Sequence, residues 1–226
     1  MQAFDEHGGV ACRHAIIRMY QAIIFFGLIA TGSVNPGSPV NSAICTMTKP
    51  KFKIATTSLA GCFGCHMSFL DMDERLAGLL EQVEFDRSPL TDIKHCGPCD
   101  IGLIEGGVCN AENVHVLREF RASCKILVAV GACAINGGVP AMRNYFDLQD
   151  CLEEVYLRGA NVTHPRIPDD PELPLLLDKV YPVSEIVAVD YFLPGCPPSA
   201  DAFLQLLQPL LAGQQPDIAS TRLHYD

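Results

Sequence analysis

The sequence has few positive charges and no long apolar run. Lysine and arginine number 16 against 26 aspartate and glutamate residues, so the formal net charge is −10. This balance argues against nucleic acid or an anionic membrane surface as the main partner, because both attract clusters of positive charge. No apolar stretch reaches the roughly 18–20 residues needed to span a bilayer, so we expect no integral membrane association.

Tryptophan is absent, whereas cysteine is abundant. The 226 residues include 11 cysteines, an odd number that cannot close entirely into internal disulfides. The chain is also far longer than the small secreted scaffolds that depend on disulfides. In a reducing compartment, thiols at CxxC spacing more often hold a metal or perform redox chemistry.

Residues 1–48 differ from the rest of the chain. A short apolar stretch, residues 22–30, follows Arg13 and Arg18, and a Gly/Ser/Pro/Asn-rich tract follows it. This order is similar to a secretory signal, but it also fits a poorly ordered extension or translated upstream sequence with Met47 as the true start. The sequence contains no adjacent arginine pair, so it lacks the signal for twin-arginine export. We expect an N-terminal extension and a cytoplasmic protein; two cysteines fall in this extension, Cys12 and Cys45.

From residue 49 onward, apolar strands alternate with amphipathic helices. The pattern predicts strands at 51–58, 101–104, 125–130 and 186–192, and helices at 68–82, 111–124 and 199–211. Pro209 should break or end the last helix early, and the Pro/Asp-rich stretch 160–177 is expected to be a surface connection. Such alternation predicts an α/β domain over 49–226, with a flavodoxin-like, doubly wound, mostly parallel sheet and helices on both faces.

Four cysteines directly follow predicted strands. Cys62 and Cys65 follow the first strand, Cys133 follows the third and Cys196 follows the last. Turns after parallel strands all lie at the carboxyl edge of the sheet, where open α/β folds place their ligands. Thiolates from three separate loops can therefore converge at this edge.

Each of these turns contains glycine: Gly61, Gly64, Gly131 and Gly195. Glycine lets the backbone approach closely, so that amide N–H groups can point at cluster sulfurs. The helices that follow direct their N-terminal dipoles at the same edge, which favours an anionic thiolate–sulfide group. The sequence thus predicts one [4Fe–4S] cluster with four cysteine ligands, bound in the glycine loops.

A second CxxC pair leaves another metal site open. Cys96 and Cys99 could combine with Cys62 and Cys65 in a zinc site. The sequence between Cys96 and Cys99 also resembles a thioredoxin dithiol, but that motif should open a long helix, whereas Asp100 leads into an apolar strand. The other cysteines of the domain are expected to be ordinary buried thiols: Cys109, Cys124 and Cys151.

Several separate motifs, in order, resemble the small subunits of soluble NAD-reducing [NiFe]-hydrogenases. They are 58–65 (SLAGCFGC), 68–75 (SFLDMDER), 100–107 (DIGLIEGG), 130–134 (VGACA), 138–144 (GVPAMRN) and 190–198 (DYFLPGCPP). The resemblance runs from about Lys51 to the last residue, Asp226.

This resemblance implies that Cys62, Cys65, Cys133 and Cys196 are the ligands of the proximal [4Fe–4S] cluster. It also implies a partner large subunit with the Ni–Fe centre, and diaphorase subunits that carry iron–sulfur clusters, FMN and NAD. The implied activity of the complex is reversible H2 oxidation coupled to NAD reduction. This chain would pass the electrons onward and catalyse nothing alone.

Other functions and cofactors remain open. The related complex I subunit has adjacent cysteines in its first loop, whereas Phe63 and Gly64 separate Cys62 from Cys65 here, which favours a hydrogenase. The alternatives are a small subunit of another type of hydrogenase or of a complex I-like electron-transfer assembly, and a zinc-stabilised interaction protein. The resemblance also makes FMN in this module conceivable, although GxGxxG and Walker motifs are absent.

Two polar residues lie next to the predicted cluster loops. Glu105 ends a strand on the same edge, so it is a candidate proton relay or polar neighbour of the cluster, or simply a structural acid. His66 follows Cys65 directly and is expected to be a neighbour of the cluster, because four thiolates already complete its ligands.

Overall fold

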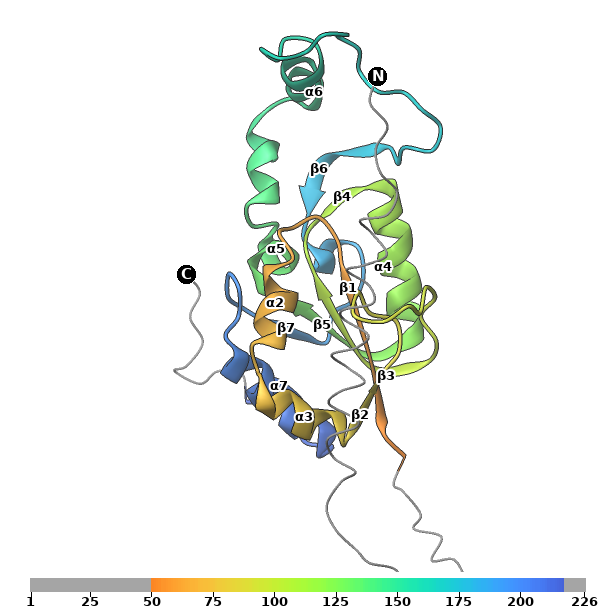
Figure 1. The fold of residues 1–226 in the computed structure, drawn as a ribbon, viewed down its shortest axis with the longest axis vertical. Coiled ribbons are helices and arrows are strands. Elements are labelled where there is room, and N and C mark those ends of the chain that lie inside the picture. The colour runs from red at the N-terminus through yellow and green to blue at the C-terminus, as the bar shows by residue number, and fades with distance from the viewer. Residues whose placement is uncertain (1–49, 218–226) are drawn as a thin grey trace, which may run out of the picture. The chain divides into compact units, whose positions relative to one another are not determined.

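A five-stranded parallel sheet forms the centre of the protein (Figure 1). The computed structural model describes residues 50–217, so the predicted extension 1–48 lies outside the described residues. The strands of this sheet are β1 (Phe52–Ser58), β2 (Val83–Phe85), β3 (Cys99–Glu105), β5 (Cys124–Val130) and β7 (Tyr191–Leu193). Their order is β2-β1-β3-β5-β7, and every pairing is parallel. This is the flavodoxin-like order, which confirms the predicted fold class.

Helices and a small second sheet complete the domain. The helices are α2 (Gly64–Leu70), α3 (Glu74–Leu80), α4 (Ala111–Ser123), α5 (Gly131–Asn136), α6 (Leu148–Tyr156) and α7 (Ala200–Leu211). Two short 3-10 helices are η1 (Pro140–Tyr145) and η2 (Val183–Glu185). The second sheet pairs β4 (Val108–Asn110) with β6 (Leu176–Tyr181) in antiparallel fashion. No helix within residues 50–217 is both long and apolar enough to cross a membrane.

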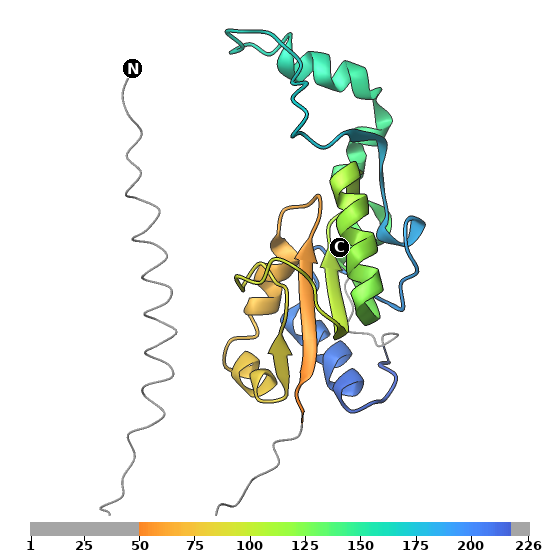
Figure 2. The same ribbon diagram turned by 90° about the vertical axis from the view of Figure 1, so that its right-hand side faces the viewer.

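The sheet buries both of its faces, as a parallel sheet requires. Successive side chains of a strand point to opposite faces, so Ile54 and Ala55 of β1 enter two different apolar clusters. Ile54 packs in the cluster that includes Phe203 of α7, whereas Ala55 packs in the cluster that includes Phe120 of α4. Figures 1 and 2 show the corresponding layers, with α2, α3 and α7 on one face of the sheet and α4 on the other.

The predicted single helix 68–82 is wrong in its bounds. The structure has two helices, α2 and α3, which are separated by a turn at residues 71–73, where Asp73 has a φ of 51°. Helix α2 also begins earlier than predicted, at Gly64, so that Cys65 lies in its first turn. Apolar spacing alone did not reveal this break, because residues on both sides of it pack against the same face of the sheet.

The last strand and helix also differ from the pattern. Only Tyr191–Leu193 pairs in the sheet, whereas Ile186 and Val187 pack against the core in irregular backbone. The carboxylate of Asp190 fastens this strand to β5 by accepting a hydrogen bond from the Leu127 amide at 2.7 Å. Pro209 lies inside α7, which continues to Leu211, because a proline in the last turn removes only one helical hydrogen bond.

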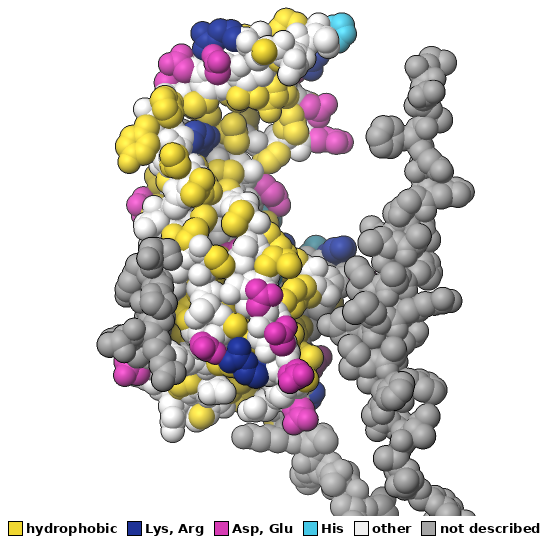
Figure 3. Space-filling model, turned by 60° about the vertical axis from the view of Figure 1, so that its left-hand side comes forward, with side chains coloured by type: hydrophobic (Ala, Val, Ile, Leu, Met, Phe, Trp, Pro, Cys, Tyr) yellow, Lys and Arg dark blue, Asp and Glu magenta, His cyan; other side chains and the backbone are white. Residues whose placement is uncertain are grey.

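Exposed apolar side chains gather on the segment after α5. Val139, Met142, Tyr145 and Phe146 are 60–85% exposed, and we call these four residues the apolar patch. They belong to η1 and the residues that flank it. Figure 3 shows hydrophobic side chains concentrated on this face of the molecule. A contiguous exposed apolar surface of this kind is typical of a site that binds another molecule.

Candidate metal centre

The four predicted cysteines lie at the carboxyl edge of the parallel sheet. Cys62 and Cys65 belong to the connection from β1 to α2 and to its first turn, Cys133 lies in α5 directly after β5, and Cys196 lies between β7 and α7. The last two loops contact each other through their backbones, since the Ala132 amide donates to the Gly195 carbonyl at 2.9 Å. The topology thus brings three distant segments to one edge.

The thiols of these loops interact with one another. Burial and then Glu105 raise the pKa of Cys65, and Cys133 and Cys62 add smaller contributions in the same direction. Burial likewise raises the pKa of Cys133, with further contributions from Cys196 and Cys62. Cys62 and Cys196 are exposed, whereas Cys65 and Cys133 are partly buried. Two of the four thiols are therefore open to solvent at the sheet edge, and the other two lie deeper.

These four thiols do not form a tight group of the size that a single ion takes. Among the described residues, no three of these four cysteines have Sγ atoms within 4.8 Å of one another. The set therefore does not match one metal ion held by three of these thiols.

The predicted glycines line this edge. Gly131 has a φ of 80°, and a Cβ atom on it would lie 2.4 Å from Sγ of Cys65, so this position requires glycine both for its backbone and for the sulfur. A Cβ on Gly64 would lie 3.1 Å from Sγ of Cys62, while Gly61 and Gly195 approach other backbone atoms instead. Gly138, which no sequence pattern singled out as a neighbour of the cysteines, also lies here, and a Cβ on it would lie 2.9 Å from Sγ of Cys133.

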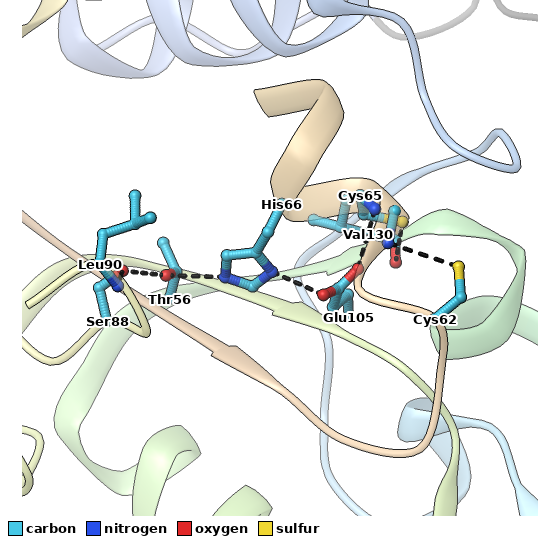
Figure 4. A network of polar contacts seen from close by, with 9 residues as sticks. Thr56, Cys62, Cys65, His66, Ser88, Leu90, Glu105 and Val130 are labelled. Carbon is cyan, nitrogen blue, oxygen red and sulfur yellow. Dashed lines mark hydrogen bonds and ion pairs between the residues drawn. The ribbon is translucent and has the colours of Figure 1, made fainter. Parts of the chain in front are cut away.

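Glu105 connects the cysteine loop to a buried polar chain (Figure 4). Its Oε2 accepts a hydrogen bond from the Cys65 amide at 3.0 Å, and its Oε1 lies 2.7 Å from Nδ1 of His66. Nε2 of His66 lies 2.9 Å from the Thr56 hydroxyl, which in turn lies 2.7 Å from the Ser88 hydroxyl. Both Glu105 and His66 are about 95% buried, so this series of hydrogen bonds runs through the interior of the protein.

The chemistry of these groups indicates which atom carries the proton between Glu105 and His66. Burial opposes ionisation of Glu105, but hydrogen bonds from His66, Cys65 and Ser58 outweigh it and lower the pKa of the carboxyl. An ionised carboxylate only accepts hydrogen bonds, so Nδ1 of His66 carries the proton between them. Both ring nitrogens of His66 are thus engaged, which supports the prediction that this residue neighbours the cysteines and does not bind a metal. The sequence offered no signal for the contribution of Thr56 and Ser88.

The rival zinc set does not come together. Cys99 begins β3, whereas Glu105, which contacts the Cys65 amide, ends it. A strand of this length, 7 residues, separates the two ends by about 20 Å. Cys96 and Cys99 therefore lie at the opposite edge of the sheet from Cys62 and Cys65.

Cys96 and Cys99 instead meet a different thiol. Their Sγ atoms and that of Cys124 all lie within 4.8 Å of one another. Cys124 is buried, as predicted, but it is not an isolated core thiol. Burial and then the neighbouring Cys99 raise the pKa of Cys96 to about 11. Cys109 and Cys151 were predicted to be buried and are only partly so.

The model of the family described as NADH ubiquinone oxidoreductase, 20 Kd subunit, matches residues 62–210, a range that includes all four cysteines of the carboxyl edge. The chain belongs to this family. Within it, the most informative relatives are subunits of hydrogenases.

The HoxS subunit delta of the NAD-reducing hydrogenase of Cupriavidus necator is 48% identical over 195 residues, which cover 84% of this chain and 93% of that protein. One subunit of the F420-non-reducing hydrogenase of Methanothermobacter marburgensis is 37% identical over 76% of this chain, but the match spans only 58% of that longer protein. The predicted resemblance to small subunits of NAD-reducing hydrogenases is confirmed.

A solved structure extends this likeness to three dimensions. The crystal structure of an NAD+-reducing [NiFe]-hydrogenase in the H2-reduced state contains a chain that is 58% identical, with a TM-score of 0.77. The match covers 78% of the present chain and 100% of that chain. The fold described above is therefore shared by a hydrogenase subunit over its whole length.

Proposed function

We propose that this chain is the electron-transfer subunit of an NAD-reducing [NiFe]-hydrogenase. The observation that carries the proposal is the convergence of Cys62, Cys65, Cys133 and Cys196 at one sheet edge, in a chain that is 48% identical to a subunit of such an enzyme. The partners we propose are a large subunit with the Ni–Fe centre and a diaphorase module, and the proposed location is the cytoplasm.

The residues of this edge fit a [4Fe–4S] cluster. All four available donors are thiols, which is the ligand set that such clusters take. Glycine also keeps the space beside two of the sulfurs free of side-chain atoms, since a Cβ on Gly131 would lie 2.4 Å from Sγ of Cys65 and a Cβ on Gly138 would lie 2.9 Å from Sγ of Cys133. When bound, the cluster would accept and release single electrons.

The chain's own residues would hold and tune this group. The Gly64 amide lies 3.4 Å from Sγ of Cys62 and donates to it, so it can stabilise negative charge on that sulfur. Glu105 fixes the Cys65 amide and, through His66, anchors the first turn of α2 to the interior. Gly131 gives the sulfur of Cys65 its space, which no larger residue could provide. These contacts position the ligands before any group binds.

The apolar patch is the surface that we assign to the large subunit. It follows α5, the helix that carries Cys133, by only a few residues. An electron carrier must lie close to the metal site that it serves, so the partner must cover the loops at this edge. Aromatic residues and methionine are enriched at such interfaces, and Tyr145, Phe146 and Met142 supply them here.

Replacing both Tyr145 and Phe146 by aspartate should weaken binding of the large subunit at least about tenfold, because the complex would then bury two unpaired carboxylates. The measurement is the yield of large subunit that co-purifies with this chain carrying an affinity tag. Leu90→Asp is the matched control, since Leu90 is also exposed but lies in the loop between β2 and β3. Equal yields from the double variant and the wild type would exclude this docking surface.

The proposal is tested by metal analysis and low-temperature EPR of the co-expressed complex. We expect about four iron and four sulfide to be assigned to this chain, with an EPR signal on reduction. Iron absent from the chain, with zinc in its place, would instead indicate a zinc-stabilised interaction protein.

FMN in this module stays a prediction. The amount of flavin extracted per complex, compared with the flavin of the diaphorase alone, decides it.

A further inference from the structure

A second group of thiols lies at the amino edge of the sheet. Sγ atoms of Cys96, Cys99 and Cys124 all lie within 4.8 Å of one another, and no other group of three or more potential metal ligands within residues 50–217 is so close. Cys99 is 2% and Cys124 is 4% exposed, while Cys96 is partly buried. The proposed function uses none of these residues.

The sheet itself holds two of the three thiols together. Cys99 and Cys124 begin neighbouring parallel strands, β3 and β5, and are direct partners in their register. Gly102 makes room for the second sulfur, since a Cβ atom at this position would lie 2.6 Å from Sγ of Cys124. Both thiols thus project from rigid backbone, which is the support that a metal site needs.

Hydrogen bonds on both sides hold the third thiol in place. The Gly97 amide donates to Oδ1 of Asp86 at 3.1 Å, and the Ser123 hydroxyl donates to the carbonyl of Cys96 at 3.2 Å. The Asp86 carboxylate also approaches Gly97 closely, since a Cβ there would lie 3.0 Å from its Oδ2. The loop before β3 is therefore fastened so that Cys96 faces the other two sulfurs.

We propose that Cys96, Cys99 and Cys124 form a structural Zn²⁺ site, with its fourth position on the side of the loop that contains Asp86. Sulfurs bound to one tetrahedral zinc ion at about 2.3 Å lie about 3.8 Å apart, which the observed grouping within 4.8 Å accommodates with little movement. Thiolate is the preferred ligand of this ion, and a water molecule or a carboxylate oxygen can complete the tetrahedron.

The third thiol separates this proposal from a simple disulfide. A disulfide would join two of the sulfurs and leave the last one without a role, whereas a metal ion uses all three. Binding would release the thiol protons and place a positive ion beside the carboxylate of Asp86. The ion would clip the loop that follows β2 to the starts of β3 and β5, at the sheet edge opposite the iron–sulfur ligands.

Zinc content of the purified co-expressed complex tests the site. Growth with added zinc and purification without chelator should give wild-type complex with about one more zinc than the Cys96→Ala variant. Iron content should stay equal in the two, because Cys96 lies far from the iron–sulfur ligands. The matched control is Cys109→Ala, another partly buried thiol, which should keep the zinc of the wild type. Equal zinc in wild type and Cys96→Ala would overturn the proposal.

A measurement on the wild-type complex does not depend on how a variant folds. We expect Cys96 to resist alkylation by iodoacetamide until a strong zinc chelator is added, and then to react at least about tenfold faster, as peptide mapping by mass spectrometry would show. Reaction at the same rate before and after chelation would overturn the site. So would a disulfide between any two of the three cysteines in the unreduced protein.

Discussion

Serine in place of Cys133 should eliminate the low-temperature EPR signal of this subunit in the reduced complex. Cys133 belongs to α5, and thiols from the loops that follow β1 and β7 contribute to the rise of its pKa, so its substitution removes one of the four proposed ligands. Hydrogen-dependent NAD reduction should fall below about 1% of the wild-type rate, because a missing or converted cluster would interrupt the electron path that we propose through this chain.

Cys196→Ser should have the same effect with less risk to folding. Cys196 is exposed in the loop before α7, so serine there removes no packed side chain. The matched control is Cys151→Ser on α6, which should retain both the EPR signal and the activity. Wild-type iron content and an unchanged EPR spectrum in Cys133→Ser and Cys196→Ser would refute the assignment of the ligands.

Alanine in place of Glu105 should destabilise the protein by roughly 2–6 kcal/mol, since each buried donor left without an acceptor costs about 1–3 kcal/mol. The substitution leaves Nδ1 of His66 and the amide of Cys65 without their acceptor in the interior. We expect a lower midpoint in chemical denaturation and loss of iron during purification. Glu84→Ala, at an exposed position of edge strand β2, should change neither quantity.

Glutamine in place of Glu105 separates positioning from simple stability. Its amide oxygen can accept from the Cys65 amide while its NH2 group donates to Nδ1 of His66, whose proton then moves to Nε2 and is donated to the Thr56 hydroxyl. The negative charge next to Cys65 is lost, but the subunit should fold and retain its iron. The Coulomb energy of a unit charge near a buried site is on the order of 1 kcal/mol, so the midpoint potential of the EPR signal should rise by roughly 40 mV. A potential identical to that of the wild type would show that Glu105 acts only on the fold.

Local patterns in the sequence were enough to predict the class of fold. The β-rich run predicted at 51–58 and the apolar run predicted at 125–130 form the central strands β1 and β5, and the continuous apolar character of the second run reflects burial on both faces. Glycine after a strand indicated that the cysteine turns lie at the carboxyl edge. The parallel arrangement follows from helices between the strands, and it makes distant loops neighbours.

Other features depended on tertiary contacts, which the apolar pattern of the sequence does not show. Short segments such as β2, β4 and α5 carry too few residues for a period to show, and the break between α2 and α3 occurs within one apolar stripe. The sequence around His66 did not indicate that this side chain links Glu105 to Thr56 in the interior, because the two residues that contact its ring come from strands β3 and β1.

The sequence by itself determined the alternation of strands and helices, the likeness to hydrogenase small subunits and the four cysteines that follow strands, since these depend on residue type and short spacing. Only the tertiary structure decided which thiols meet. Cys99 and Cys124 are brought together by the register of β3 and β5, while the length of β3 keeps Cys96 and Cys99 away from Cys62 and Cys65. Spacing along the chain cannot show this, because distances between side chains are decided by strand order and register.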